Sequence, residues 1–181
     1  MNILKTERLI LRRWEENDAT DLYKHACDPA VGTMAGWPAH QSVSESRDVI
    51  KNILNGKESY ALCLRENERA IGAVELKLKD QSDLCNQDDE CEIGFWLGRE
   101  FWGRSLMPEA VNEIIRHAFA DLGMQKIWIR HYEGNSNSKR VQEKCGFQYQ
   151  WTANNVDVPL LNEKRTIHVS LLTREDWLAN S

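Results

Sequence analysis

The sequence predicts a protein of the α+β class, with a mixed β-sheet that carries helices on both faces. Two helical patterns come early in the chain, and two alternating strands that suit a hairpin follow them. The second half then runs strand, helix, strand, helix and strand, an order typical of a mixed sheet. No repeat, low-complexity tract or internal linker interrupts the chain, so residues 1–181 are expected to form a single domain.

The composition is that of a globular protein. The 181 residues are 41% hydrophobic and 28% charged, which suits one domain with a substantial core. A net charge of −5 argues against general binding to nucleic acid or to anionic membranes. The chain contains no run of 18 apolar residues and no signal-peptide pattern, so we expect no contact with a membrane.

The cysteines and histidines indicate free thiols and no metal site. The five cysteines form an odd, scattered set without a C-x-x-C pair, which is typical of a reducing compartment. The five histidines are also scattered and do not pair with the cysteines at the spacing of a zinc site. We therefore expect a cytoplasmic protein without a disulfide framework and without metal.

The chain opens with a predicted strand over residues 7–14 and a helix that stops before Pro29. Residues 32–40 are expected to be irregular, because a glycine and a proline interrupt them. Trp37 in this segment is a candidate substrate-binding residue. The alternative is that its ring closes the edge of the core.

A second helix and a hairpin are predicted next. Ser42 opens a capping-box sequence, and apolar residues at helical spacing continue as far as Gly56. Alternating strands around 60–64 and 74–78 then form the hairpin candidate. The acidic segment 80–92 is expected to be a solvated link, and the alternative is a surface that attracts a cationic acceptor.

Residues 91–122 are the central feature of the sequence: an apolar strand, a loop with Gly103 and Ser105, and the longest amphipathic helix. The unpaired N–H groups of a first helical turn and the positive end of the helix dipole make such a loop suitable for phosphate. The alternative is a strand and a helix packed together without a ligand. The apolar stripe of the helix consists of Leu106, Met107, Ala110, Val111, Ile114, Ile115, Ala118, Phe119 and Leu122.

The last part of the chain contains three short strands and one helix. A strand is predicted over 126–132, and a helix over 139–146 follows a turn-rich segment. Two more strands are expected around 147–151 and 166–172. Together with the earlier elements this makes about seven strands.

Four motifs occur in order along the chain. They are TERLILRRW near the start, EIGFWL and WGRSLMPEA in the middle, and Asn135-x-x-Ser138 followed by KCGF. In this order they resemble the GNAT superfamily of acetyl-CoA-dependent N-acetyltransferases, and most of all the branch that acetylates ribosomal-protein N-terminal amines. The resemblance covers nearly the whole chain. It implies one N-acetyltransferase domain over 1–181 with a mixed, mostly antiparallel sheet.

The resemblance implies an enzyme that moves acetyl from acetyl-CoA to a primary amine by direct attack, without a covalent enzyme intermediate. The acceptor would be a protein N-terminus or a small molecule such as an amino acid, a polyamine or an amine-bearing drug. A homodimer is a common expectation for this branch. One alternative is a CoA-binding interaction or regulatory module with impaired catalysis, and another is a domain without a CoA site.

The resemblance also implies which residues bind acetyl-CoA, through backbone groups of the central strand and through a pyrophosphate loop. The family pattern of that loop is Gln/Arg-x-x-Gly-x-Gly/Ala, and here Trp102, Ser105 and Met107 replace its three specified positions. Binding is expected to survive, because the Ser105 hydroxyl could donate to phosphate. The candidates are Phe95, Trp96, Leu97, Trp102, Gly103, Arg104, Ser105, Leu106, Met107, Asn135, Ser138, Lys139 and Arg140. For the three basic residues, a solvated surface role is the alternative.

Acetyl transfer to an amine requires a group that removes the amine proton and a group that protonates the leaving thiolate. Glu92 matches the family glutamate that acts as the base, and the alternative is a strand-end surface carboxylate. Gln142 occupies the position of the usual tyrosine acid and cannot replace it. Ser138 then matches a serine that acts as the acid or orients the cofactor, with Tyr132 in reserve. Asn135 either binds the pantetheine amide or caps the following helix.

Overall fold

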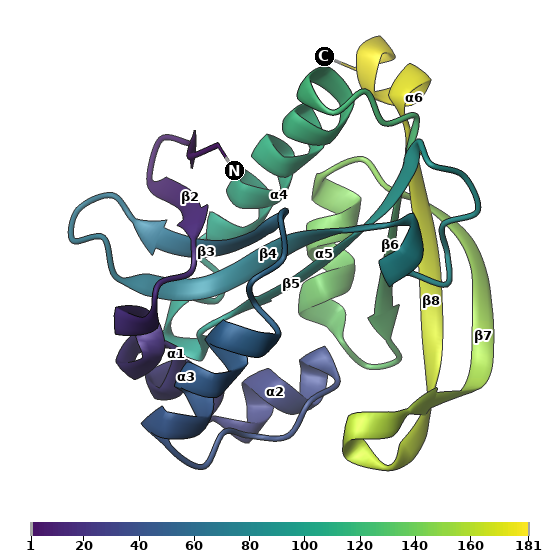
Figure 1. The fold of residues 1–181 in the computed structure, drawn as a ribbon. Coiled ribbons are helices and arrows are strands. Elements are labelled where there is room, and N and C mark those ends of the chain that lie inside the picture. The colour runs from purple at the N-terminus through teal and green to yellow at the C-terminus, as the bar shows by residue number, and fades with distance from the viewer. Residues whose placement is uncertain (1, 181) are drawn as a thin grey trace. The chain divides into compact units, whose positions relative to one another are not determined.

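The computed structural model describes residues 2–180, and Figure 1 shows its elements. Eight strands form one sheet in the order β1-β2-β3-β4-β5-β6-β8-β7. Their bounds are β1 (Leu4–Lys5), β2 (Leu9–Arg13), β3 (Ser59–Leu64), β4 (Ala70–Leu78), β5 (Glu90–Leu97), β6 (Lys126–Tyr132), β7 (Gln148–Val158) and β8 (Glu163–Thr173). The α-helices are α1 (Ala19–Ala26), α2 (Pro29–Ala35), α3 (Val43–Asn52), α4 (Leu106–Arg116), α5 (Ser136–Lys144) and α6 (Arg174–Ala179).

The sheet is mixed and mostly antiparallel, which confirms the predicted class. The pairs β1–β2, β2–β3, β3–β4, β6–β8 and β7–β8 are antiparallel, and β5–β6 is parallel. The sheet has eight strands instead of about seven because β1 has only two residues, too few to produce a pattern in the sequence.

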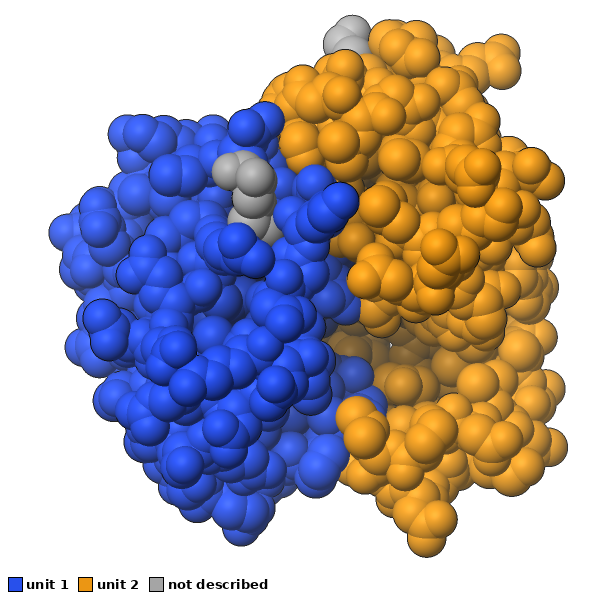
Figure 2. Space-filling model, viewed as in Figure 1, with its two compact units in different colours: residues 1–75, 95–110 blue, residues 76–94, 111–181 orange. Residues whose placement is uncertain are grey.

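The chain divides into two compact units (Figure 2). Unit 1 contains Met1–Glu75 and Phe95–Ala110, and unit 2 contains Leu76–Gly94 and Val111–Ser181. Strands β4 and β5 and helix α4 each contribute residues to both units. The single domain over 1–181 stays a prediction.

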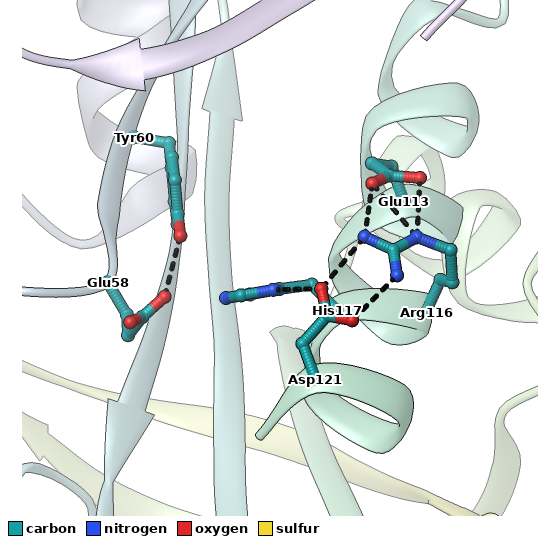
Figure 3. A network of polar contacts seen from close by, with 6 residues as sticks. All are labelled: Glu58, Tyr60, Glu113, Arg116, His117 and Asp121. Carbon is teal, nitrogen blue, oxygen red and sulfur yellow. Dashed lines mark hydrogen bonds and ion pairs between the residues drawn. The ribbon is translucent and has the colours of Figure 1, made fainter. Parts of the chain in front are cut away.

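The core of unit 1 lies between its strands and the helices α1 and α3. The predicted hairpin is confirmed, since Tyr60 of β3 pairs with Val74 of β4. Tyr60 is fully buried, and its hydroxyl donates to Glu58 at 2.7 Å (Figure 3). One apolar cluster joins helix and strand residues; its buried members are Trp14, Ala19, Leu22, Ala26, Ile50, Ala61, Cys63, Ala70 and Ala73.

The prediction that residues 32–40 are irregular is wrong in its first part, because helix α2 runs through Ala35. Asp28 caps this helix by accepting a hydrogen bond from the Ala30 N–H at 2.9 Å, and a proline occupies its first turn. Gly36 ends it in the left-handed region, at φ 90°. The sequence therefore contains the start signal of this helix, Asp28 followed by proline, and its stop signal, Gly36.

Gly72 in β4 allows a close approach to the backbone of β5 within unit 1. A Cβ atom at Gly72 would lie 2.5 Å from the Trp96 carbonyl oxygen and 3.1 Å from the Leu97 Cα. Backbone atoms of a paired strand cannot move aside as a flexible side chain can. We expect Gly72→Ala to lower the free energy of unfolding by about 1–3 kcal/mol, measured by urea denaturation. Gly56→Ala is the control, because its Cβ would meet only the Ser59 Cβ at 3.6 Å. Equal losses in both variants would contradict the prediction.

In unit 2, strand β6 has the bounds predicted from the sequence. It pairs in parallel with β5, with Glu90–Ile93 opposite Lys126–Ile129, and antiparallel with β8 on its other side. The β7–β8 hairpin in Figure 1 is longer than predicted. Most of β7 is exposed, and its register shifts twice, so its residues do not alternate between apolar and polar.

The amphipathic helix is confirmed as α4, which a short π-helical turn, His117–Asp121, extends. Eight of the nine residues of the predicted stripe, all except Leu122, are no more than 4% exposed. Within residues 2–180, no helix has the length and apolar character needed to cross a bilayer.

A polar network in unit 2 joins the last turn of α4 to the π-helical turn (Figure 3). Arg116 donates from Nη2 to Glu113 at 2.8 Å and to Asp121 at 3.0 Å. The His117 Nδ1 lies 2.8 Å from the Asp121 carboxylate. The hydrogen bonds from Arg116 and then His117 lower the pKa of Asp121 to about 2. The carboxylate is therefore ionised at neutral pH and fixes this end of the helix.

Candidate functional site

The loop between β5 and α4 lies in unit 1 and contains the predicted pyrophosphate-binding residues. A 3₁₀ turn, Arg99–Phe101, follows β5, and the Trp102 Nε1 donates to the Leu97 carbonyl oxygen at 2.7 Å. The next three residues, 103–105, are exposed. Leu106 and Met107 are buried in the apolar stripe, so at these two positions only backbone groups are available to a ligand of this loop.

Two residues of this loop have left-handed backbone conformations. Gly103 has φ +76° and Ser105 has φ +57°. For a non-glycine residue, this region costs about 1–2 kcal/mol relative to the right-handed one. The strain at Ser105 explains in physical terms why a glycine suits this position in the family pattern.

Contacts from the N-terminal segment hold the same loop, and no spacing pattern in the sequence predicts them. The Arg8 guanidinium donates to the carbonyl oxygens of Arg104 (3.0 Å) and Ser105 (3.3 Å). It also donates to Glu109 of α4 at 2.7 Å. Arg8 lies in the TERL motif and Glu109 in the PEA motif. Both motifs carry the family resemblance, but neither motif by itself predicts a contact between the two residues.

The structure brings together two of the predicted binding residues, Trp37 and Trp96, in an aromatic cluster of unit 1. Their ring centroids are 5.9 Å apart in an edge-to-face arrangement. Trp96 also stacks on Trp14 at 6.3 Å, and Trp37 lies 5.3 Å from the His40 ring. Trp14 is buried, whereas Trp37 and Trp96 are half-buried and keep exposed surface that a ligand could contact.

In unit 2, Glu92 is buried and bonded on both carboxylate oxygens. Arg130 of β6 donates to it from Nε at 2.8 Å and from Nη2 at 2.9 Å, and the Ser82 hydroxyl donates at 2.5 Å. Glu92 is 3% exposed, so the alternative of a strand-end surface carboxylate is wrong. The parallel register of β5 and β6 brings the two side chains together, because Glu92 lies opposite Trp128, two residues before Arg130.

Arg130 also forms an ion pair with Asp83, in the segment before β5. Burial opposes the charge of Arg130, but the hydrogen bonds to Glu92 and Asp83 outweigh it and raise the pKa of the guanidinium above its ordinary value. The hydrogen bond from Arg130 is the main cause that lowers the pKa of Asp83. Part of the acidic segment 80–92 is therefore bound to the strands and is not a freely solvated link.

Helix α5 positions Asn135 and Ser138. The Asn135 Oδ1 accepts a hydrogen bond from the Ser138 N–H at 3.1 Å, so the predicted helix cap is present. The Ser138 hydroxyl is buried and accepts from Gln142 at 3.4 Å. Gln142 in turn accepts from the His131 Nδ1 at 3.1 Å. An amide oxygen can only accept, so the proton of this bond lies on His131.

Burial is the main cause that lowers the pKa of His131 below its ordinary value, and the charge of the nearby His168 acts in the same direction. His131 is therefore neutral at pH 7 and carries its proton on Nδ1. The chain of donors then runs from His131 through Gln142 to Ser138. Because the Ser138 oxygen accepts from Gln142, its own hydrogen remains available to another acceptor.

Among the described residues, the other predicted residues of unit 2 make no hydrogen bond to this chain of donors. The Tyr132 ring is half-buried and stacks against the Arg165 guanidinium, 4.8 Å from the ring centroid. Lys139 and Arg140 are exposed on α5, which is consistent with their alternative of a solvated surface role. Lys139 lies 3.9 Å from the Glu143 carboxylate, one turn along the same helix.

Comparisons with known proteins find similar chains. A family model described as an acetyltransferase (GNAT) domain matches residues 8–148. N-acetyltransferase p20 of Bacillus licheniformis, named as uncharacterized, is 31% identical over 82% of this chain and 83% of its own. YdaF of Bacillus subtilis (strain 168), provisionally named a ribosomal N-acetyltransferase, is 34% identical over 32% of each chain.

Solved structures share the fold at low sequence identity. A GNAT-family acetyltransferase from Bacillus anthracis matches with a TM-score of 0.82 and 18% identity, over 96% of this chain and 99% of that one. The microcin C7 self-immunity acetyltransferase MccE, solved with acetyl-CoA and AMP, matches with a TM-score of 0.75 and 20% identity. That match covers 92% of this chain and 93% of MccE.

Proposed function

The chain belongs to the GNAT acetyltransferase family, and we propose that it moves an acetyl group from acetyl-CoA to a primary amine. In the proposed reaction the amine lone pair attacks the thioester carbon, a C–N bond forms and the C–S bond breaks. The amine loses a proton, and the leaving thiolate takes one to give CoA. The acceptor is a protein N-terminus or a small-molecule amine. We further propose that residues 1–181 act as one domain, in a cytoplasmic homodimer.

The loop before α4 is the observation that carries the proposal. Its left-handed residues Gly103 and Ser105 lie directly before the first turn of an 11-residue helix. Backbone N–H groups at such a turn bind phosphate oxygens without a basic side chain. A Cβ atom at Gly103 would meet nothing within 4 Å, so there is open space beside the loop backbone. The residues present therefore fit a pyrophosphate.

The side chains of unit 2 support individual roles in proton transfer. Ser138 is proposed to donate its free hydrogen toward the thioester sulfur, because Gln142 occupies its acceptor side. Glu92 is proposed as the base; Arg130 and Ser82 bind its two oxygens with three hydrogen bonds, which leaves one of the roughly four acceptor positions of a carboxylate for a proton. Tyr132 is the reserve acid.

The second candidate function is a CoA-binding module without catalysis. Gln142 favours it, because glutamine stands where the resemblance expects a tyrosine acid, and both ends of its amide are already bonded. In this function the chain would bind CoA and would not turn over acetyl-CoA.

Thermal unfolding with acetyl-CoA tests the proposal. A ligand at about 100 times its Kd stabilises the folded state by about 2.7 kcal/mol. For a chain of this size, the midpoint should rise by about 5–11 °C. CoA and dephospho-CoA, which keep the pyrophosphate, should give a similar rise. Acetyl-pantetheine lacks the pyrophosphate and should give little.

Thiol release then separates the two functions. Release of CoA thiol in the presence of a primary amine supports the acetyltransferase. A clear rise in the midpoint without thiol release across protein N-terminal peptides, amino acids and polyamines would select the module instead. No rise with any of the CoA compounds would contradict both functions.

A further inference from the structure

We infer that Arg8, fixed by Glu109, is a positioning residue that holds the loop before α4 in its phosphate-binding conformation. The inference rests on the proposed function, since it concerns the same acetyl-CoA site. Arg8 and Glu109 are 101 positions apart in the sequence, and both belong to unit 1.

The Arg8 guanidinium uses separate donors for separate parts of the loop. Nη1 donates to the Arg104 carbonyl oxygen at 3.0 Å, and Nη2 donates to the Ser105 carbonyl oxygen at 3.3 Å. Nε donates to the Glu109 carboxylate at 2.7 Å. A planar guanidinium can bind all three acceptors at once, because its donors are fixed in a fork.

Together with the backbone bond from the Glu109 N–H to the Ser105 carbonyl oxygen at 3.4 Å, these bonds determine where the loop N–H groups point. In a planar trans peptide, the C=O and N–H groups of one peptide unit point in opposite directions. Arg8 binds the carbonyl oxygens of Arg104 and Ser105. The N–H groups of the same two peptide units, those of Ser105 and Leu106, are therefore directed away from Arg8. They are the groups that precede and open α4, where phosphate would bind.

Glu109 keeps the Arg8 side chain in place. Its carboxylate accepts from the Arg8 backbone N–H at 2.8 Å, from the Arg8 Nε at 2.7 Å and from the Thr6 hydroxyl at 2.5 Å. Burial would raise the pKa of Glu109, but the hydrogen bonds from Thr6 and Arg8 outweigh it and lower the pKa. Glu109 is therefore ionised at neutral pH and binds Arg8 by charge as well as by hydrogen bonds.

The loop needs such support because of Ser105. At φ +57°, a serine is in a region that glycine populates freely and other residues avoid. Without Arg8, Ser105 is expected to relax toward negative φ, which turns the neighbouring peptide units. A glycine at this position would tolerate the left-handed conformation without the hydrogen bonds from Arg8. The effects of changing Arg8 and Ser105 should therefore be coupled.

A double-mutant cycle tests this coupling through the acetyl-CoA Kd, measured by isothermal titration calorimetry on the folded full-length protein. Arg8→Met should raise the Kd about tenfold, equivalent to about 1.4 kcal/mol. Ser105→Gly alone should leave the Kd unchanged or lower it. In the Ser105→Gly background, Arg8→Met should raise the Kd less than about threefold. A role in stability alone would move the melting temperature and would not produce this coupling in the Kd.

Two further variants control for charge. Arg65 also donates to backbone carbonyl oxygens, at Thr6 (3.1 Å) and Glu7 (3.4 Å), and makes no such bond to the loop among the described residues. Arg65→Met removes the same charge as Arg8→Met and should leave the Kd within twofold. Arg8→Lys keeps the charge but lacks the fork, so it should bind nearly as weakly as Arg8→Met.

The outcomes distinguish this inference from the proposed function. If the wild-type protein binds no acetyl-CoA, the proposed function fails and the inference with it. If the wild type binds but Arg8→Met binds within twofold of it, or the two changes are additive, only the inference is overturned. Full binding by Arg8→Lys would also overturn it, because Arg8 would then act by charge alone. A tenfold loss in Ser105→Gly would show that the serine hydroxyl binds phosphate, which contradicts a role in loop conformation alone.

Discussion

Arg130→Met is expected to lower the free energy of unfolding by about 3–5 kcal/mol, because it leaves the Glu92 carboxylate buried without its ionic partner. Glu92 is 3% exposed, and Arg130 supplies two of the three hydrogen bonds described for it. The remaining bond, from the Ser82 hydroxyl, does not neutralise the charge. Urea denaturation followed by circular dichroism measures the change.

A second variant distinguishes two contributions to this loss of stability: the unpaired charge of Glu92 and the lost packing of the Arg130 side chain. Glu92→Leu combined with Arg130→Met removes both charges, and should recover most of the stability that Arg130→Met loses. Asp83, the other partner of Arg130, is 77% exposed at its side chain and can be solvated when left alone. A double variant as unstable as Arg130→Met would show that the cost lies in packing around Arg130, contrary to this prediction.

Glu92→Gln is expected to lower the rate of acetyl transfer by about 100-fold or more, the usual contribution of a general base. The loss should be largest at low pH. There the acceptor is an ammonium ion, which has no lone pair until a base removes its proton, and glutamine cannot do so. The measurement is kcat/KM for a primary amine between pH 6 and 9.

Glu90→Gln is a matched control for this variant. Glu90 lies two residues earlier on the same strand, is also 3% exposed, and binds Lys126 at 3.0 Å and the Trp128 indole at 3.2 Å. Its replacement removes a buried carboxylate from the same strand and should leave the pH–rate profile unchanged. If Glu92→Gln gives the wild-type profile as well, Glu92 is not the base and serves only to hold Arg130.

Local side-chain spacing was sufficient to predict the regular elements that bury one clear face. Helix α4 has its apolar residues at intervals of three and four, and those from Leu106 to Phe119 are buried. Strand 126–132 combines β-branched and aromatic residues between turn signals, and its predicted bounds match those of β6. Such elements are predictable because the geometry of one helix or one strand produces the pattern.

Elements without such a face are not predictable from local spacing. Helix α2 has seven residues, of which only Val31 and Gly32 are buried, so its Asp-Pro and glycine boundaries resemble the breaks of an irregular segment. Strand β7 is exposed over most of its length, so its extent depends on hydrogen bonds to β8 and not on its own pattern. Short or exposed elements are defined by their neighbours.

The sequence by itself determined the order of the elements that bury a clear face, the amphipathic helix, and the resemblance to an N-acetyltransferase family that the comparisons confirm. Only the tertiary structure decided how the candidate residues are held. Glu92 and Arg130 are 38 positions apart in the sequence and come into contact because β5 and β6 pair in parallel. Arg8 and Glu109 are 101 positions apart and also form a hydrogen bond. Periodicity reports which side of an element faces the core, whereas an ion pair requires two side chains to meet at one point. Whether two such side chains come into contact is determined by the register of the strands and the packing of the helices, and both depend on the whole fold.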